Sequence, residues 1–429
     1  MNRFLRMTTS VLLSSAAGVF VVGGTAAADT INIIATSDAV PRFELAAKVF
    51  KERTGHDVEI TSTGYDQSHA MIVTSQQAKS AAFDIAKVDT IWVAGFARSG
   101  YCVPLDEWID AAEWEDTIAP SRDAMSFDGK TWAKGGGNAT VNFYYNEKLL
   151  KEAGFDAPPA TLQEMISQAR AVQEKGLAPY GTAWGWSQGE GVVIDYTWLV
   201  GAFGGKMQDD TGAFIFNNEA GVATLQWMVD QLRGGLADPA SLTFDNRAVV
   251  QLFIKGDVPF MFNWPFTWTW GKDPTRSEIV DDIRMGVIPP YSGDSAAKSA
   301  TVIGNSGHCV LASSQKKEVA WEFLKLASSA EMERRYIEDL NDFNTVTHVS
   351  IFSDAAMLEK HPQFAIFTEQ YETAFNRPEI AWYAQFSSLL ASALHRALTG
   401  GGEPKAVLDD VVGRLNELRA IYASAEEAQ

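Results

Sequence analysis

Short runs of aliphatic and β-branched residues alternate with amphipathic helical stretches along the first hundred residues of the chain. The pattern predicts strands at 30–35, 58–61 and 83–88, and helices at 43–53, 67–79 and 91–99. The pair Thr54-Gly55 ends the first of these helices. Strand, helix and strand joined by short connections form βαβ units, so we expect an α/β fold with a largely parallel sheet.

Helical patterns dominate the C-terminal third of the chain. We expect helices at 316–328, 332–340, 386–398 and 405–422. In the middle of the chain, Thr161 and Glu164 have the spacing of a capping box, which predicts a helix running from there to about residue 175. The length of 429 residues suggests two domains. Because no repeat and no Pro/Gly/Ser-rich linker divides the chain, two domains would have to be joined by continuous crossing segments.

The first 28 residues differ in composition from the rest. Arg3 and Arg6 precede an apolar run at 11–22, and an Ala-x-Ala cleavage signal ends at Ala28. The apolar run is well short of the roughly 20 residues that cross a bilayer. We therefore predict that residues 1–28 are a secretory signal peptide cleaved after Ala28, so that the mature protein is exported and released.

The charge balance limits the possible partners. The chain has 35 Lys and Arg against 54 Asp and Glu, a formal net charge of −19, and no segment gathers its basic residues into a stripe. Binding to nucleic acid phosphates or to an anionic membrane surface is therefore not expected. The two cysteines, Cys102 and Cys309, have no spacing motif, and we favour two buried free thiols over a single bridge, although sequence alone leaves the bridge open.

Enzymatic motifs are weak. The sequence from Gly185 to Gly189 fits the Gly-x-Ser-x-Gly nucleophile elbow, but that motif needs a strand before Ser187 and a helix after it. Gly189 and Gly191 are poor residues for starting a helix, so we do not expect that context. No zinc-protease motif and no calcium loop is present in the sequence. A glycosidase carboxylate pair has no spacing signature, so a secreted glycoside-acting hydrolase stays the alternative hypothesis.

Aromatic residues give a more informative signal. Several of the 13 tryptophans cluster beside turn-forming and polar residues, as do Trp186 within Gly-Trp-Ser and Trp264 beside Asn263 and Pro265. Core packing is the ordinary explanation for any one tryptophan. An aromatic face with nearby Asp, Asn and Gln side chains also suits the apolar face and hydroxyl rim of a sugar ring.

A set of short motifs then appears in a characteristic order along almost the whole chain. They are Asp84-Ile85 with Val88-Asp89-Thr90-Ile91-Trp92, Asp128-Gly129-Lys130, Tyr144-Tyr145-Asn146, Pro158-Pro159-Ala160-Thr161, Gly204-Gly205, Ala320-Trp321-Glu322-Phe323, Arg377-Pro378 and Leu398-Thr399-Gly400. In this order they resemble the extracellular solute-binding proteins of carbohydrate ABC transporters, the group that includes maltose- and trehalose-binding proteins.

This resemblance implies a two-lobed α/β periplasmic-binding-protein fold, with three interlobe crossovers and a central ligand cleft. Lobe 1 would comprise 29–137 and 304–341, and lobe 2 would comprise 138–303 and 342–429. The implied function is capture of a sugar or glycoside in the cleft and delivery to the membrane permease subunits of an ABC importer. The resemblance further implies a monomer that performs no covalent chemistry and needs no cofactor or metal.

The resemblance also implies ligand-binding positions, carried over by their place in the chain. In lobe 1 and at the first crossing these are Ser37, Asp38, Arg42, Tyr65, Asp66, Asp89, Trp92 and Asn138. In lobe 2 and at the second crossing they are Trp186, Asp195, Tyr196, Asn263, Trp264, Phe266, Gly304 and Asn305. Many relatives have Gly-Gly-Trp at the second crossing, where this chain has Gly304-Asn305-Ser306. One stacking aromatic is therefore missing there or supplied from elsewhere.

Overall fold

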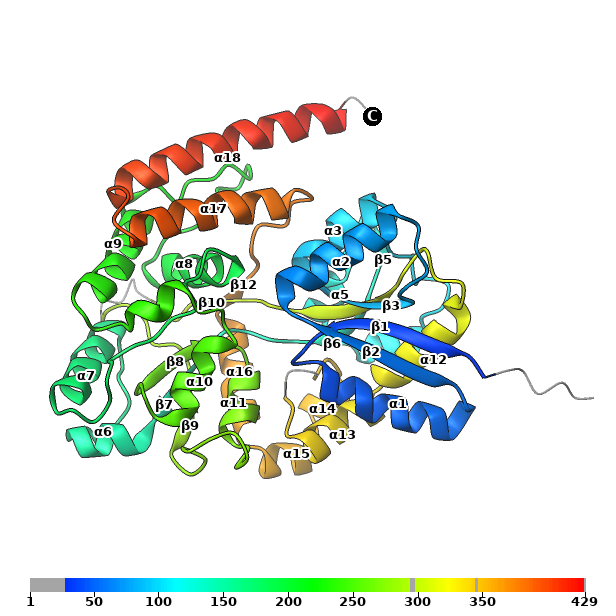
Figure 1. Ribbon diagram of the computed structural model, residues 1–429, viewed down its shortest axis with the longest axis horizontal. Coiled ribbons are helices and arrows are strands. Elements are labelled where there is room, and N and C mark those ends of the chain that lie inside the picture. Colours follow the sequence, from blue (N-terminus) through cyan, green and yellow to red (C-terminus); the bar gives the residue numbers. More distant parts are fainter. Residues whose placement is uncertain (1–27, 294–297, 344–345, 428–429) are drawn as a thin grey trace, which may run out of the picture.

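The computed structural model describes residues 28–293, 298–343 and 346–427. Residues 1–27, nearly all of the predicted signal peptide, lie outside the described residues, and the predicted cleavage after Ala28 is not tested by them. The helices and strands gather into two groups, each built on its own sheet (Figure 1). We call them the five-stranded group, drawn on the right in Figure 1, and the three-stranded group, drawn on the left.

The five-stranded sheet has the strand order β2-β1-β3-β11-β6. Its strands are β1 (Thr30–Thr36), β2 (Asp57–Thr63), β3 (Ile85–Asp89), β11 (Ser306–Val310) and β6 (Lys134–Gly137). Strand β1 is parallel to β2 and β3, as the βαβ pattern predicts. Strand β11 is antiparallel to both β3 and β6, so the expectation of a largely parallel sheet is wrong for this half. The reason is that β11 arrives from a distant part of the chain and not through a βαβ connection.

Helices cover both faces of this sheet (Figure 1). They are α1 (Val40–Thr54), α12 (Lys317–Ala327) and α13 (Ala330–Leu340) on one face, and α2 (Tyr65–Gln77) and α3 (Thr90–Arg98) on the other. Each confirms a predicted helix to within a few residues. Along β1, Ile33 packs into the cluster that contains Phe43 and Phe323, whereas Ile34 packs into the cluster that contains Ile72 and Trp92. Successive strand residues point to opposite faces, so both faces are apolar.

The remaining short elements of this group precede the first connection to the other group. They are α4 (Ala111–Asp116), α5 (Ala119–Ala124), β4 (Ser126–Phe127) and β5 (Lys130–Thr131).

The three-stranded sheet has the order β8-β7-β9 and is antiparallel throughout. Its strands are β7 (Asn142–Asn146), β8 (Phe260–Asn263) and β9 (Ile283–Gly286). The helices of this group are α6 (Glu147–Ala153), α7 (Leu162–Glu174), α8 (Glu190–Ala202), α9 (Glu219–Arg233), α10 (Ala248–Lys255), α11 (Phe266–Gly271), α16 (Gln363–Glu372), α17 (Tyr383–Leu398) and α18 (Pro404–Glu427), with a 3-10 turn at Pro239–Leu242. The predicted cap of α7 is confirmed, since the Glu164 N–H donates to Thr161 Oγ1 at 3.0 Å.

Segments from distant parts of the chain lie side by side between the two groups. Strand β10 (Thr301–Val302) pairs in parallel with β12 (Ala374–Phe375), and Thr140 forms a bridge with Ile303. Helices α14 (Val349–Phe352) and α15 (Ala355–Lys360) follow α13 along the same edge of the molecule (Figure 1). The groups are thus joined by several segments of the chain, in agreement with the lack of a single linker in the sequence.

The two cysteines form a disulfide, so the preference for free thiols is wrong. The Cα atoms of Cys102 and Cys309 are 5.8 Å apart although 207 residues separate them in sequence. Strand β11 carries Cys309 to the side of β3, and the Val103 N–H donates to the Val310 carbonyl at 3.0 Å. This pairing holds the segment before α4 against the sheet, a proximity that sequence spacing cannot reveal.

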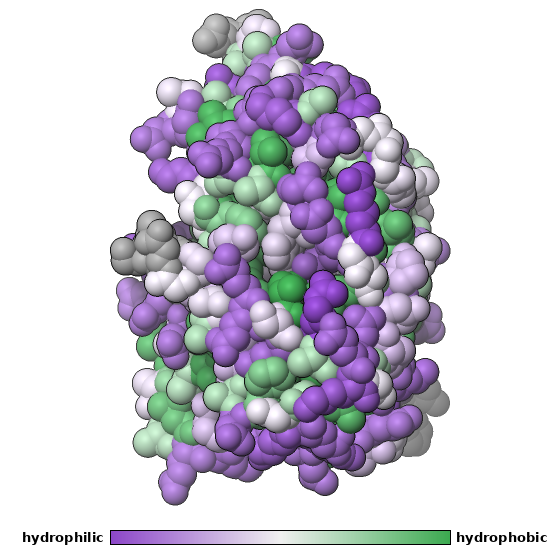
Figure 2. All heavy atoms as spheres, turned by 90° about the vertical axis from the view of Figure 1, so that its left-hand side faces the viewer, coloured by the Kyte–Doolittle hydropathy of each residue, from purple (hydrophilic) through white to green (hydrophobic). Residues whose placement is uncertain are grey.

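The face of the three-stranded group shown in Figure 2 is covered mainly by hydrophilic residues, with hydrophobic residues in small scattered patches. Such a distribution is ordinary for a protein surface in contact with water. Across residues 28–427, as far as they are described, no helix combines the length and the apolar character needed to cross a membrane.

Candidate functional site

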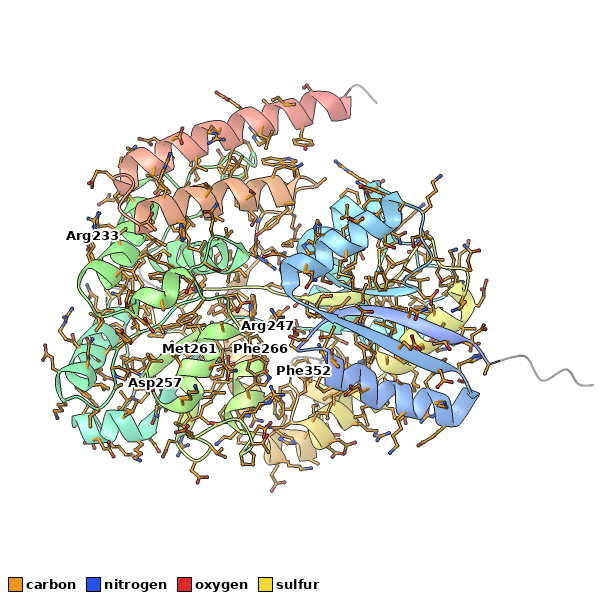
Figure 3. All side chains as sticks on the ribbon, viewed as in Figure 1. Arg233, Arg247, Asp257, Met261, Phe266 and Phe352 are labelled. Atoms are coloured by element: carbon orange, nitrogen blue, oxygen red, sulfur yellow. A yellow bond between two sulfur atoms is a disulfide. The ribbon has the colours of Figure 1, made fainter. Side chains whose placement is uncertain are left out.

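A cavity of about 280 Å³ lies between the two groups and is lined by residues of both. On one side, its lining follows the carboxyl ends of β1, β2 and β3, where parallel strands bring their succeeding loops to one edge of the sheet. On the other side it is lined by the start of α8, the loop before α10 and the turn between β8 and α11. Figure 3 shows Arg247 and Phe266 at this boundary between the groups.

Five of the predicted residues from the five-stranded group line the cavity. They are Asp38, Arg42, Tyr65, Asp66 and Asp89. The other two of this group lie beside it: Ser37 is exposed at the end of β1, and Trp92 is buried with its ring centroid 4.9 Å from that of Tyr65.

From the opposite side and the second crossing, Trp264, Phe266 and Gly304 line the cavity. The neighbouring Asn263 is buried and does not line the cavity, but it shapes the turn that carries the two rings. Its Oδ1 accepts a hydrogen bond from the Trp264 N–H at 2.8 Å, and its Nδ2 donates to the Asn246 carbonyl at 2.7 Å. The two crossing residues Asn138 and Asn305 lie near the cavity without lining it.

The remaining predicted residues, Trp186, Asp195 and Tyr196, lie in the core of the three-stranded group. The Trp186 ring stacks on Trp184 at 5.0 Å between centroids. Its indole N–H donates to Asp195 at 3.0 Å, and the Trp198 indole donates to the same carboxyl at 3.1 Å. Burial raises the pKa of Asp195 to about 7, although both indole hydrogen bonds act in the opposite direction. These groups support the wall of the cavity from behind.

Eight polar residues that were not among the predicted ligand-binding positions also line the cavity. They are Gln67, Lys87, Ser187, Glu190, Asp245, Asn246, Arg247 and Ser306. A signal existed for Lys87, because it stands two residues before Asp89 on the same face of an otherwise apolar strand. Arg247 carries no comparable signal, since its partner is Asp38, more than two hundred residues earlier in the chain.

Asp38 is the centre of a charge cluster that spans the two groups. Arg247 Nη2 is paired with Asp38 Oδ1, and Lys87 Nζ lies 3.6 Å from Asp38 Oδ2. Burial opposes the charged carboxylate, but Lys87, Arg247 and Arg42 together hold the pKa of Asp38 well below its ordinary value. Burial lowers the pKa of Lys87, with Asp38 acting against that shift. Asp38 is therefore ionised at neutral pH.

A second cross-group network lies at the opposite end of the cavity. The buried Arg377 side chain contacts Asp89 at 3.1 Å and Glu190 at 2.8 Å. Tyr65 donates its hydroxyl to Asp89 at 3.0 Å, and Tyr383 donates its hydroxyl to Glu190 at 2.7 Å. Burial raises the pKa of Glu190, and Arg377 is the strongest influence in the other direction. Because Arg377 follows β12, this network ties the connecting segments to both groups.

The Trp264 ring packs against the second crossing segment at Gly304. A Cβ atom built on Gly304 would lie 2.3 Å and 2.4 Å from Cζ3 and Cη2 of the Trp264 ring. The ring therefore packs directly on the Gly304 backbone. Trp264 thus brings an indole ring to the second crossing, where the sequence Gly304-Asn305-Ser306 has no aromatic residue of its own.

The Gly-x-Ser-x-Gly motif has a structural explanation. Helix α8 begins at Glu190 directly after Gly189, so the expectation that no helix starts there is wrong. Ser187 lies between α7 and α8 with no strand leading directly into it, and among the described residues its hydroxyl makes no hydrogen bond to a histidine. Cβ atoms built on Gly185 and Gly191 would lie 2.4 Å and 2.7 Å from the Asn246 side-chain oxygen, so these glycines allow Asn246 to approach closely.

Metal chemistry has no support in the described part of the chain. Within the ranges that the structure describes, no group of three or more His, Cys, Asp or Glu residues is arranged to hold a metal ion.

Two groups, each built on its own sheet, enclose a cavity lined by residues of both. The sequence model of the bacterial extracellular solute-binding protein family matches residues 36–334, and the chain belongs to this family. It is thus a solute-binding protein of an ABC transporter, a non-enzymatic transport component. The prediction that the chain is not an enzyme is confirmed, and the hydrolase alternative is set aside.

Individual relatives agree with this assignment. The chain is 24% identical over 383 residues to a probable ABC transporter-binding protein of Deinococcus radiodurans, covering 87% of this chain and 89% of that protein. The structure of maltose-bound T. maritima MalE3 matches with a TM-score of 0.85 at 22% identity, over 91% of this chain and all of that one. A solute-binding protein from Agrobacterium radiobacter K84 in complex with ribitol matches with a TM-score of 0.81 at 23% identity, over 91% and 98%. These similarities confirm the mixed α/β fold of periplasmic binding proteins.

Proposed function

We propose that this chain is a periplasmic binding protein that captures a sugar or related polyol between two lobes and delivers it to the membrane permease subunits of an ABC importer. The observation that carries the proposal is the cavity between the groups. It combines paired charges on both sides with the Trp264 and Phe266 rings on one wall. Hydroxyl groups donate to carboxylates and accept from Arg and Lys, while an aromatic ring covers the apolar face of a sugar.

The proposed lobes follow the two groups. Lobe 1 comprises 29–137 and 304–341, and lobe 2 comprises 138–303 and 342–429. Three crossing segments, near Asn138, Gly304 and Asp342, connect them and act as the hinge. The pairing of β10 with β12 and the bridge between Thr140 and Ile303 support a hinge made of adjacent backbone segments. Ligand contacts on both lobes favour the closed arrangement in proportion to the difference in affinity between the closed and open forms.

Relatives support a polyhydroxylated ligand. Solved structures of similar fold are described as bound to maltose, ribitol or D-mannitol. The lining cations Arg42, Lys87 and Arg247 each already face a carboxylate, which favours an uncharged ligand over an anionic one. The proposal includes a monomeric carrier released into the periplasm after cleavage behind Ala28.

Thermal unfolding with a panel of ligands tests the proposal. A ligand that binds only the folded protein adds about 2.7 kcal/mol at a hundredfold excess over Kd, which is easily seen as a rise in melting temperature. We expect at least one saccharide or alditol to raise it and the ligand to be recovered chemically intact. If a wide panel of saccharides and alditols produces no shift, while a panel of amino acids or peptides does, the proposed ligand class is wrong.

A further inference from the structure

The cavity between the groups continues at both ends into neighbouring hollows. One hollow of about 430 Å³ shares Asp38 and Phe266 with the cavity. Another of about 290 Å³ shares Tyr65, Asp66 and Glu190 with it. Because the three spaces share lining residues, the residues that separate them limit the length of a ligand.

The first partition is the contact between Asp38 and Arg247. Asp38 stands after β1 in the five-stranded group, and Arg247 stands before α10 in the three-stranded group, so their ion pair crosses the cleft. Only 12% of the Asp38 side chain and 22% of the Arg247 side chain are exposed. Lys87 holds Asp38 from behind at 3.6 Å, and the Arg247 guanidinium lies 5.8 Å from the centroid of the Phe266 ring. Both partners are thus fixed by further contacts.

The second partition lies at the opposite end. The Asp66 carboxylate lies 3.7 Å from a Cβ built on Gly189, so the two lobes approach closely there. Behind this contact, Arg377 binds Asp89 and Glu190 and so holds the two sides together. This end is closed by a network of several groups, whereas the first end depends on one ion pair.

The charges inside the cavity select against an anionic ligand. Each of the three lining cations already faces a carboxylate: Arg42 lies 3.4 Å from Asp342, and Lys87 and Arg247 both face Asp38. Asp66 and Asp245 add further carboxylates to the lining. An added negative charge would find no surplus of positive charge, whereas neutral hydroxyl groups can hydrogen-bond to ions of both signs.

We infer, as an extension that rests on the proposed function, that the site takes one small neutral polyhydroxylated unit, a monosaccharide or an alditol. The ion pair of Asp38 with Arg247 is the specificity determinant that excludes longer saccharides at one end. The cavity volume of about 280 Å³ agrees, since it lies just below the roughly 300–1,000 Å³ typical of pockets for drug-sized ligands.

Isothermal titration calorimetry with matched ligands tests this inference. The probes are D-glucose, D-mannose, D-mannitol and ribitol against maltose, maltotriose, mannobiose and sucrose. We expect one of the first four to bind the wild-type protein at least a hundredfold more tightly than any of the last four. A di- or trisaccharide that binds as tightly as the small probes would overturn the inference while leaving the carrier function intact. If no probe of either kind binds, it is the proposed function that fails.

A substitution at Arg247 tests the partition itself. Arg247→Ala should open the cavity toward the hollow beside Trp270 and shift the ratio of disaccharide to monosaccharide affinity at least tenfold toward the disaccharide. Arg247→Gln keeps most of the side-chain volume and should change the ratio less, which separates steric closure from charge. Arg276→Ala is the matched control, because Arg276 lines only the neighbouring hollow. Circular dichroism establishes that each variant is folded. An unchanged ratio in folded Arg247→Ala protein would refute the role of the ion pair.

Discussion

Replacing Gly304 with alanine should weaken ligand binding more than it destabilises the fold. The new Cβ would lie 2.3 Å from the Trp264 ring, whereas ordinary contacts begin near 3.4 Å, so the ring has to retreat by about 1 Å. The Gly304 backbone is outside the left-handed region, so alanine adds no conformational strain of its own. Trp264 is only partly buried and lines the cavity, which gives the ring room to move on that side alone.

The magnitude follows from that geometry. Adding a methyl group to a filled site costs about 1–3 kcal/mol. Because the ring can move into the cavity, we expect the larger share of this cost to appear in binding, as a loss of affinity of about tenfold, or about 1.4 kcal/mol. Calorimetric titration with the best ligand from the thermal panel measures the affinity, and urea unfolding of the free protein measures the stability.

A double-mutant cycle makes this reasoning refutable. Trp264→Ala should by itself weaken the free energy of ligand binding by about 2 kcal/mol if the ring stacks on the ligand. In the Trp264→Ala protein, the Cβ added by Gly304→Ala meets no ring, so the second substitution should weaken binding by almost nothing further. Equal effects of the Gly304 substitution in both backgrounds would show that the ring and the glycine are not coupled, and the described position of Trp264 would then be wrong.

Three further predictions concern the support of the site. Replacing Cys102 and Cys309 with serine should lower the free energy of unfolding by at most about 5 kcal/mol, given the 207-residue separation, and reductant should lower wild-type stability in urea but leave the double variant unchanged. Burial raises the pKa of Asp195 to about 7, so the folded state keeps a proton that the unfolded state loses near pH 4. The free energy of unfolding should therefore fall as the pH rises from about 4 to 7. Urea titrations of Asp195→Asn across that range should show a shallower fall. Arg377→Met should cost about 3 kcal/mol of stability and also weaken ligand binding, because it leaves the largely buried carboxylates of Asp89 and Glu190 without their shared cation. A loss of stability with unchanged affinity would limit the residue to a structural role.

The sequence predicted the elements whose signal is local. The strand at 30–35 and the helix capped by Thr161 form where alternation and capping chemistry place them, because each depends on neighbours a few residues away. The direction of β11 could not be predicted in this way, because its neighbours in the sheet, β3 and β6, lie far from it along the chain. For the same reason the disulfide of Cys309 was missed.

The lining of the cavity was predictable only where family resemblance or strand ends point to it. Asp38, Tyr65 and Asp89 each follow a predicted strand, and the structure places all three on the cavity. Trp186 and Trp264 look alike in sequence, since each is an indole beside turn-forming residues, yet one stacks inside the core and the other lines the cavity. The distinction depends on which side chains pack against each tryptophan in the folded protein, and the neighbouring residues in the sequence do not indicate this.

The central place of β11 in the five-stranded sheet has a consequence for the order of folding. Strands β3 and β6 are complete by residue 137, but the strand that pairs with both of them begins only at Ser306. Until that residue has been synthesised, two sheet edges remain unpaired and the N-terminal half cannot reach its final structure. Contacts so distant in sequence form slowly, because closing the long intervening loop costs conformational entropy before the new contacts stabilise it. The five-stranded sheet can therefore be completed only after residue 306 of the 429 has been synthesised.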